Sequence, residues 1–186
     1  MQNGQRKKIV SNTASPEPLR IAGIVPGSIV DGPGIRFVVF TQGCPHGCPG
    51  CHNPDTHDPK GGSEADIPSI LARLDEDLLL SGVTFSGGEP FMQAAALVPL
   101  AEAVKVRGKN LMVYTGYQYE QLVHMEQPGV QRLLSLADLL VDGPFVLAEK
   151  DLTLPYRGGS NQRVIDLVRT REAGEIVLYR SEYEDL

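Results

Sequence analysis

Three cysteines close together limit most strongly what this chain can fold into. Cys44, Cys48 and Cys51 are the only cysteines among the 186 residues, and the segment that holds them reads GCPHGCPGC. Its prolines lack an amide donor and its glycines favour turns, so this segment is predicted to be a loop. An odd number of cysteines so close together does not fit a disulfide framework. The loop is therefore predicted to fold three thiolates around a metal centre, in a protein of the cytoplasm.

The number of thiolates bears on the identity of the metal. Structural zinc takes four ligands, so a zinc site would need His46 or His52 as the fourth. A four-iron cluster is usually held by four cysteines, so three would leave one iron open. Inert or redox-active thiols are a further alternative. The spacing favours the open four-iron cluster, because a metal that does chemistry keeps a free coordination position.

The rest of the chain alternates between strand and helix patterns. Apolar, mostly β-branched runs predict strands at 20–25, 35–41, 82–86, 111–114, 138–142 and 176–179. Apolar residues at helical spacing predict helices at 63–80, 91–106, 119–125, 130–136 and 162–171. Ser63 and Asp66 are expected to cap the first of these helices, and Pro99 to kink or divide the second.

This alternation is typical of a parallel sheet with crossover helices. A closed eight-stranded barrel needs about 250 residues, which is more than the chain contains. The predicted fold is therefore α/β, an open partial barrel of about five or six mainly parallel strands, in one domain over 19–186. Residues 1–18 are basic and lack the apolar stretch of a signal peptide, and they are predicted to be a disordered tail.

Charge and hydropathy argue against two classes of partner. The formal net charge is −6, whereas binding to nucleic acid needs a basic face that neutralises phosphates. Apolar runs are all shorter than the roughly 18 residues of a membrane span. The chain is therefore predicted to bind neither nucleic acid nor membrane.

Small and acidic residues follow the predicted strands where they end. The segment 86–89 reads SGGE, Thr115 follows the next strand, and Asp142 ends the one after. Ligands of parallel α/β folds bind at the carboxyl ends of the strands, so these residues and the cysteine loop are predicted to line one mouth. Each also has a plainer interpretation: the glycines as a tight turn, the glutamate as a helix cap, the aspartate as a turn residue.

Taken together, these motifs resemble the radical S-adenosylmethionine superfamily, in which a C-x3-C-x2-C loop is followed by a segment like SGGEP. The stretches DGPGIRFVVFTQGC and CHNPDTHDPKGG are similar to those of glycyl-radical-enzyme activating proteins. VDGPF and RGGSNQR, in a chain this short, resemble the activators of anaerobic (class III) ribonucleoside-triphosphate reductase. Pyruvate formate-lyase activators are similar around the cysteines but longer. The resemblance covers residues 24–167.

The resemblance implies a [4Fe-4S] cluster on Cys44, Cys48 and Cys51, whose fourth iron is chelated by S-adenosylmethionine. It also implies a set of cofactor-binding residues, namely Gly50, Cys51, His52, Ser86, Gly87, Gly88, Glu89, Thr115, Asp142 and Asn161. In this set 86–89 would bind the methionine amine, and the two neighbours of Cys51 would approach the adenosyl part. Pro144 stands where related activators often have lysine, so any role of that lysine is lost.

The function implied is reductive cleavage of S-adenosylmethionine, followed by abstraction of a hydrogen atom from a glycine Cα of the reductase. The implied partners are the glycyl radical subunit of that reductase and a reduced flavodoxin- or ferredoxin-type electron donor. The open side of a partial barrel would admit a backbone loop. Two alternatives are the activation of another glycyl radical enzyme and a non-catalytic Cys3His zinc interaction module. The zinc alternative leaves the SGGE segment and Asp142 without a purpose.

Overall fold

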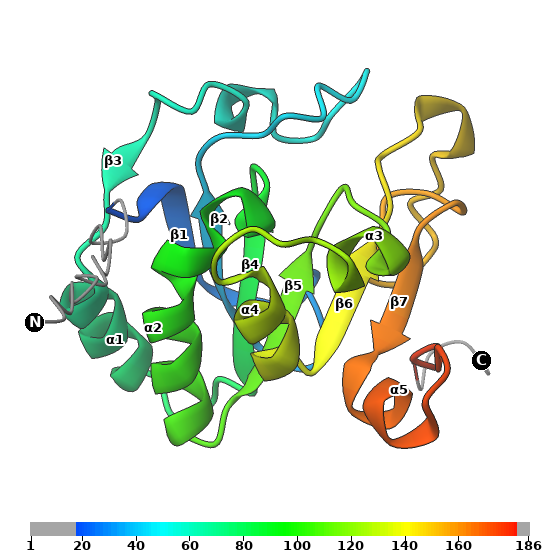
Figure 1. Ribbon diagram of the computed structural model, residues 1–186. Coiled ribbons are helices and arrows are strands. Elements are labelled where there is room, and N and C mark those ends of the chain that lie inside the picture. Colours follow the sequence, from blue (N-terminus) through cyan, green and yellow to red (C-terminus); the bar gives the residue numbers. More distant parts are fainter. Residues whose placement is uncertain (1–17, 182–186) are drawn as a thin grey trace, which may run out of the picture.

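One open sheet of seven strands forms the centre of the computed structural model, which describes residues 18–181 (Figure 1). The strands are β1 (Arg20–Ser28), β2 (Arg36–Thr41), β3 (Ser63–Glu64), β4 (Gly82–Gly87), β5 (Asn110–Tyr114), β6 (Leu139–Asp142) and β7 (Arg163–Asp166). Their order across the sheet is β3-β1-β2-β4-β5-β6-β7. The four strands β2, β4, β5 and β6 are parallel to one another, whereas β1, β3 and β7 are joined antiparallel. The predicted open α/β sheet is confirmed.

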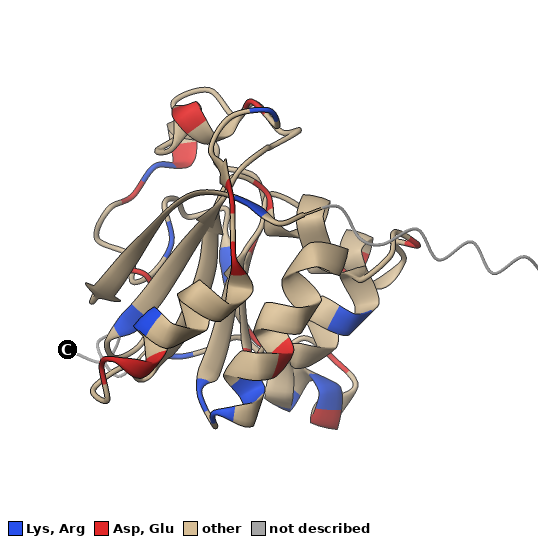
Figure 2. Cartoon of the chain, turned by 90° about the vertical axis from the view of Figure 1, so that its left-hand side faces the viewer, with Lys and Arg blue, Asp and Glu red and all other residues tan. Residues whose placement is uncertain are grey.

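Helices cover one face of this sheet. They are α1 (Ile67–Asp75), α2 (Ala94–Val106), α3 (Tyr119–Val123), α4 (Val130–Leu136) and α5 (Leu167–Ala173), with short 3-10 turns η1 (Pro54–Thr56), η2 (Pro90–Gln93) and η3 (Leu147–Glu149). In Figure 1, α1, α2 and α4 lie in front of the strands, and Figure 2 shows helices to one side of the sheet. Leu97 and Leu100 of α2 are buried in one core with Phe85 and Val113 of the sheet. Removal of this apolar surface from water holds the helical layer on the strands.

The opposite face of the sheet carries the residues that alternate with this core. Met112, Leu139 and Val141 form a second, smaller cluster there, with Tyr114 packed against it. Because successive side chains of a strand point to opposite faces, Ser86 of β4 lies on this second face as well. The loops that follow β2 and β6 rise above the same end of the sheet (Figure 1). The second face and these loops together enclose the site described below.

The sequence prediction was wrong about the number of strands and about two of the helices. Five or six strands were expected, but β3 and β7 bring the sheet to seven. The first part of the predicted helix 63–80 is β3, which pairs with β1, and α1 starts only after Asp66 and ends at Asp75. The first part of the predicted helix 162–171 is β7, which pairs with β6. Pairing with distant strands decides both cases, and local spacing does not encode it.

Three smaller expectations also differ from the structure. Asp66 caps α1 by accepting a hydrogen bond from the amide of Ser69, but its expected partner Ser63 lies in β3. Pro99 lies inside α2, which is a single helix, so this proline does not divide it. The predicted strand 176–179 is reduced to one bridge, between Leu178 and Ile165.

Within residues 18–181, none of the helices is long and apolar enough to cross a membrane. Lys and Arg positions are interspersed with Asp and Glu positions along the backbone drawn in Figure 2. The predicted tail falls almost wholly on residues 1–17, which lie outside the described residues, as do 182–186. The division into a tail and one domain, and the cytoplasmic location, stay predictions.

Candidate iron–sulfur and cofactor site

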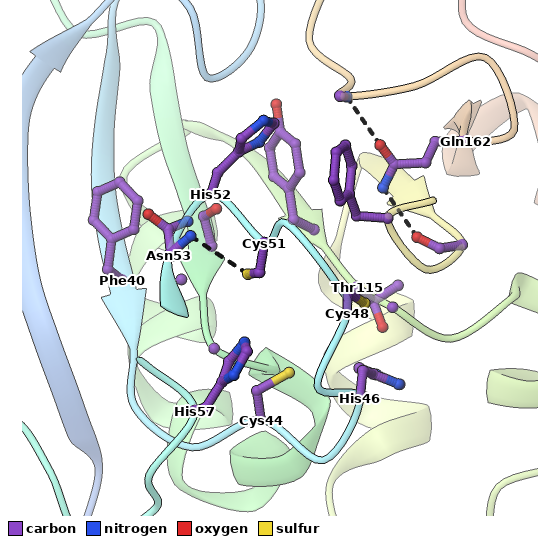
Figure 3. A pocket seen from close by; sticks show the side chains of 18 of the residues that line it. Phe40, Cys44, His46, Cys48, Cys51, His52, Asn53, His57, Thr115 and Gln162 are labelled. Carbon is purple, nitrogen blue, oxygen red and sulfur yellow. Dashed lines mark hydrogen bonds between the residues drawn. The ribbon is translucent and has the colours of Figure 1, made fainter. Parts of the chain in front are cut away.

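All three cysteine side chains line one cavity of about 350 Å³ at the carboxyl ends of the parallel strands (Figure 3). Five of the other cofactor-binding residues implied by the resemblance line it too, namely His52, Ser86, Gly87, Gly88 and Thr115. They lie at or just after the ends of β2, β4 and β5, so segments far apart in the chain meet at one point. The strand-end argument predicted this convergence for the cysteine loop, 86–88 and Thr115, but Glu89 and Asp142, which it also placed there, do not line the cavity.

The cysteine segment is a loop, and backbone hydrogen bonds give it its shape. Gly43 and Cys44 donate their amides to the carbonyls of Thr56 and His57, at 2.8 and 3.1 Å. Gly47 and Gly50 have φ of 57° and 73°, in the left-handed region that glycine adopts without strain. The loop is therefore held at its start by the segment that follows the cysteines. The three thiols are half-buried and form no disulfide bond.

Backbone amides lie close to two of the sulfur atoms. Burial raises the pKa of the Cys44 thiol, and hydrogen bonds from the backbone of His46 and Gly47 oppose that rise. The amide of Asn53 donates to Sγ of Cys51 at 3.4 Å. Hydrogen bonds of this kind stabilise thiolates, which is the state in which cysteine binds metal.

The donor set fits a cluster better than a single ion. Across residues 18–181, no three His, Cys, Asp or Glu side chains form a group that could hold one metal ion. A zinc site needs its ligands gathered around one atom, whereas a four-iron cluster takes each thiolate on a different iron. His46, a possible fourth zinc ligand, has its Nε2 engaged by Glu89 at 2.8 Å. These observations weigh against the zinc alternative.

A buried nitrogen beside the cysteines also fits a bound group. His57 lines the cavity next to Cys44 (Figure 3), and its Nε2 is buried without a hydrogen-bond partner among the described residues. An unpartnered buried nitrogen costs about 1–3 kcal/mol, so such atoms call for a partner outside the protein chain. His57 was given no role from the sequence.

The two glycines of the SGGE segment let two loops approach each other. A Cβ atom on Gly88 would lie 2.3 Å from the carbonyl oxygen of Gly43, and one on Gly87 would lie 2.8 Å from Cα of Phe40. Gly88 donates its amide to Thr41, and Glu89 donates its amide to Gly43, both at 2.8 Å. The close approach required here is between β4 and the start of the cysteine loop.

The Glu89 carboxylate is buried behind this turn and does not line the cavity. It accepts hydrogen bonds from the amides of Phe91 and Gly116, from the hydroxyl of Thr115 and from Nε2 of His46, at 2.8 to 3.0 Å. It also caps η2. Thus the plainer interpretation of Glu89 as a cap holds, and its predicted contact with the methionine amine stays a prediction.

Asp142 and Asn161 lie outside the cavity wall as well, and so does Gly50. The buried Asp142 accepts a hydrogen bond from the amide of Tyr119 at 2.8 Å and pairs with the guanidinium of Arg163. Asn161 donates its side-chain amide to the carbonyl of Pro144 at 2.8 Å. Gly50 lies beneath Leu147, because a Cβ there would be 3.0 Å from that side chain.

Several residues that line the cavity were not predicted. Phe40 and Tyr114 lie on the second face of the sheet near the ends of β2 and β5, where alternation along the strands could have indicated them.

Two further residues of the cavity come from the loops. Phe145 packs beside His52, with ring centroids 4.9 Å apart. Gln162 joins two loops by accepting the amide of Gly158 and donating to the carbonyl of Gly143 (Figure 3). The sequence contains no signal for such contacts between loops.

Comparison with known proteins defines the class to which this site belongs. A family model described as a 4Fe-4S single cluster domain matches residues 30–165, which include all three cysteines and the SGGE segment. The chain therefore contains a 4Fe-4S single cluster domain over these residues.

Individual relatives narrow the class. The anaerobic ribonucleoside-triphosphate reductase-activating protein of Escherichia coli K12 is 35% identical over 147 residues, which cover 75% of this chain and 93% of that protein. The protein of the same name from enterobacteria phage T4 is 32% identical, and the matched residues make up 90% of that protein. The pyruvate formate-lyase-activating enzyme of Clostridium pasteurianum is 42% identical, but over 54% of this chain and 44% of that enzyme. The chain belongs to the family of anaerobic ribonucleoside-triphosphate reductase-activating proteins.

Proposed function

We propose that this chain is a radical S-adenosylmethionine enzyme that generates a glycyl radical on an anaerobic ribonucleoside-triphosphate reductase. The observation that carries the proposal is the shared cavity of three cysteines and residues 86–88, with no fourth cysteine in the chain. The chain matches its relatives in the reductase-activating family over nearly their whole length, which supports the reductase as its target.

In this proposal Cys44, Cys48 and Cys51 hold a [4Fe-4S] cluster, and the residues around it hold S-adenosylmethionine. When bound, the reduced cluster would supply the electron for reductive cleavage of the sulfonium, which is the chemistry that removal of a hydrogen atom from a glycine of the reductase requires. Ser86 and the adjacent Gly87 would face the methionine part. The aromatic rings of Phe40 and Tyr114 would wall the cavity against water.

The electron is proposed to come from a reduced flavodoxin- or ferredoxin-type protein. All three cysteines of the chain lie in one loop, so the chain has no cysteines for a second iron–sulfur centre. An external donor must then deliver the electron to the one cluster.

Activation of another glycyl radical enzyme is the nearest competing function. The high identity to a pyruvate formate-lyase-activating enzyme favours shared chemistry, but the matched residues make up only 44% of that enzyme. The difference in coverage supports the ribonucleotide reductase as the target.

The test is electron paramagnetic resonance of the reductase after anaerobic incubation with the reconstituted chain, S-adenosylmethionine and a reductant. A glycyl radical signal that depends on all three components is expected, and the Cys48→Ala variant should give none. A signal on a formate-lyase but not on the reductase would contradict the proposed target. Cleavage of S-adenosylmethionine without a signal on either would contradict both targets.

A further inference from the structure

His46, between the first two cysteines, makes a buried contact that the proposed function does not use. Its Nε2 lies 2.8 Å from Oε2 of Glu89, whose side chain is 0% exposed. Glu89 also accepts from the amides of Phe91 and Gly116 and from the hydroxyl of Thr115. Since every other partner of the carboxylate is a donor, His46 donates from Nε2–H, and this bond to a carboxylate is of the stronger kind.

Packing fixes the ring in addition to this bond. The imidazole lies edge-on to the ring of Tyr117, with centroids 4.6 Å apart and planes at 71°. On another side it lies against Gly116, where a Cβ atom would come within 2.4 Å of Cδ2. The ring is therefore held by the loop after β5, which is anchored in the sheet.

His46 stands midway between two of the predicted cluster ligands, two residues after Cys44 and two before Cys48. All three residues line the same cavity. Hydrogen bonds to the sulfurs and solvent exposure are among the factors that set the reduction potential of an iron–sulfur cluster. A ring that fixes this turn thus fixes the surroundings of both sulfurs.

We propose that His46 is a positioning residue that anchors the cysteine loop to the buried Glu89 and so holds the turn between Cys44 and Cys48 in place. In this role it binds no metal. It determines how rigid the loop is before the cluster is bound, and at what potential the cluster accepts its electron. The inference rests on the proposed function only for the potential, because the anchor exists in the protein chain itself.

The experiment compares three variants of the full chain with wild type. His46→Phe keeps a ring against Tyr117 but cannot donate to Glu89, and His46→Asn is too short to reach it. His46→Gln keeps an N–H at similar reach. His124→Phe is the matched control, because His124 is exposed and lies at the end of α3.

The first measurement is hydrogen exchange of residues 43–51 in the cluster-free protein. Loss of a hydrogen bond to a charged group should speed exchange of the Cys44 and Gly43 amides by about tenfold or more in His46→Phe and His46→Asn. His46→Gln and His124→Phe should remain close to wild type. If His46→Phe does not fold, the comparison of His46→Asn with His46→Gln still tests whether the hydrogen bond to Glu89 holds the loop.

The second measurement is the midpoint potential of the reconstituted cluster, which a merely structural role would leave unchanged. It should move away from the wild-type value in His46→Phe and His46→Asn, by about 59 mV for each tenfold change in affinity for the electron. His46→Gln should restore it.

Two results would overturn the inference while the proposed function stands: exchange and potential of His46→Phe and His46→Asn equal to wild type, or the same losses in His46→Gln. A wild-type chain that takes up no cluster would instead contradict the proposed function. In that case the exchange measurement would still test the anchor by itself.

Discussion

Glu89 joins three loops through one buried carboxylate. It binds the cysteine loop at His46, the loop after β5 at Thr115 and Gly116, and the start of η2 at Phe91. The sequence places Glu89 after a strand and predicts a cap or a ligand, but it cannot show which donors surround the carboxylate. Those donors come from loops after two other strands, and only the folded sheet brings them together.

The first prediction at this scale concerns the stability that this carboxylate provides. Glu89→Gln should lower the free energy of unfolding of the cluster-free protein by about 2–4 kcal/mol, because it disrupts a buried, fully hydrogen-bonded charge. Urea denaturation measures the change. Glu102→Gln is the control, because its pair with Arg132 is exposed and contributes under about 1 kcal/mol. Equal losses in both variants would contradict the role assigned to Glu89.

Gly88 supports a second prediction. Gly88→Ala would place a Cβ 2.3 Å from the carbonyl oxygen of Gly43, so the start of the cysteine loop must move. The variant should retain less iron after anaerobic reconstitution than wild type. Gly23→Ala should retain as much as wild type, because a Cβ there has no neighbour within 4 Å. Full iron content in Gly88→Ala would show that this close approach does not matter for the site.

At the scale of elements, Arg163 of β7 connects two acidic residues from different parts of the fold. Its guanidinium pairs with Asp142 at the end of β6 and with Glu120 of α3. The bond to Arg163 lowers the pKa of Glu120 from its ordinary 4.5 to about 2. Arg163 thus links α3 to the end of β6, next to the strand pairing that joins β7 to β6.

The pH dependence of stability tests this connection. A carboxylate with a lowered pKa stabilises the fold above its unfolded value and loses that contribution as the pH falls toward its folded value. Glu120→Gln should therefore be less stable than wild type at pH 7, by under about 1 kcal/mol because the pair is exposed. The difference should fade between pH 4.5 and about 2. Urea unfolding over this range measures it, and a difference independent of pH would contradict the ion pair.

Prediction of the elements succeeded where the signal is local. The strand β2 follows from its apolar β-branched run, and Asp66 caps α1 as expected, although the predicted helix began too early, at Ser63. It failed at β3 and β7, which exist because each pairs with a distant strand. Asp166, which caps α5, was the local signal that the predicted helix 162–171 starts too early.

For the whole molecule, the parallel strands and their loops place the site at one end of the sheet, on the face that α1, α2 and α4 leave uncovered. The location of the site could be predicted, because carboxyl ends of parallel strands share an edge. The loops that complete it, with Phe145 and Gln162, could not, since their contacts depend on tertiary packing.

The central claim is that three thiolates hold a four-iron cluster, and the iron and acid-labile sulfide content of the chain tests it most directly. After anaerobic reconstitution, wild type should contain about four of each per chain. Cys48→Ala should lose most of both, while the control Gly23→Ala keeps them. A wild-type chain that stays colourless, or that contains zinc and no sulfide, would contradict the account.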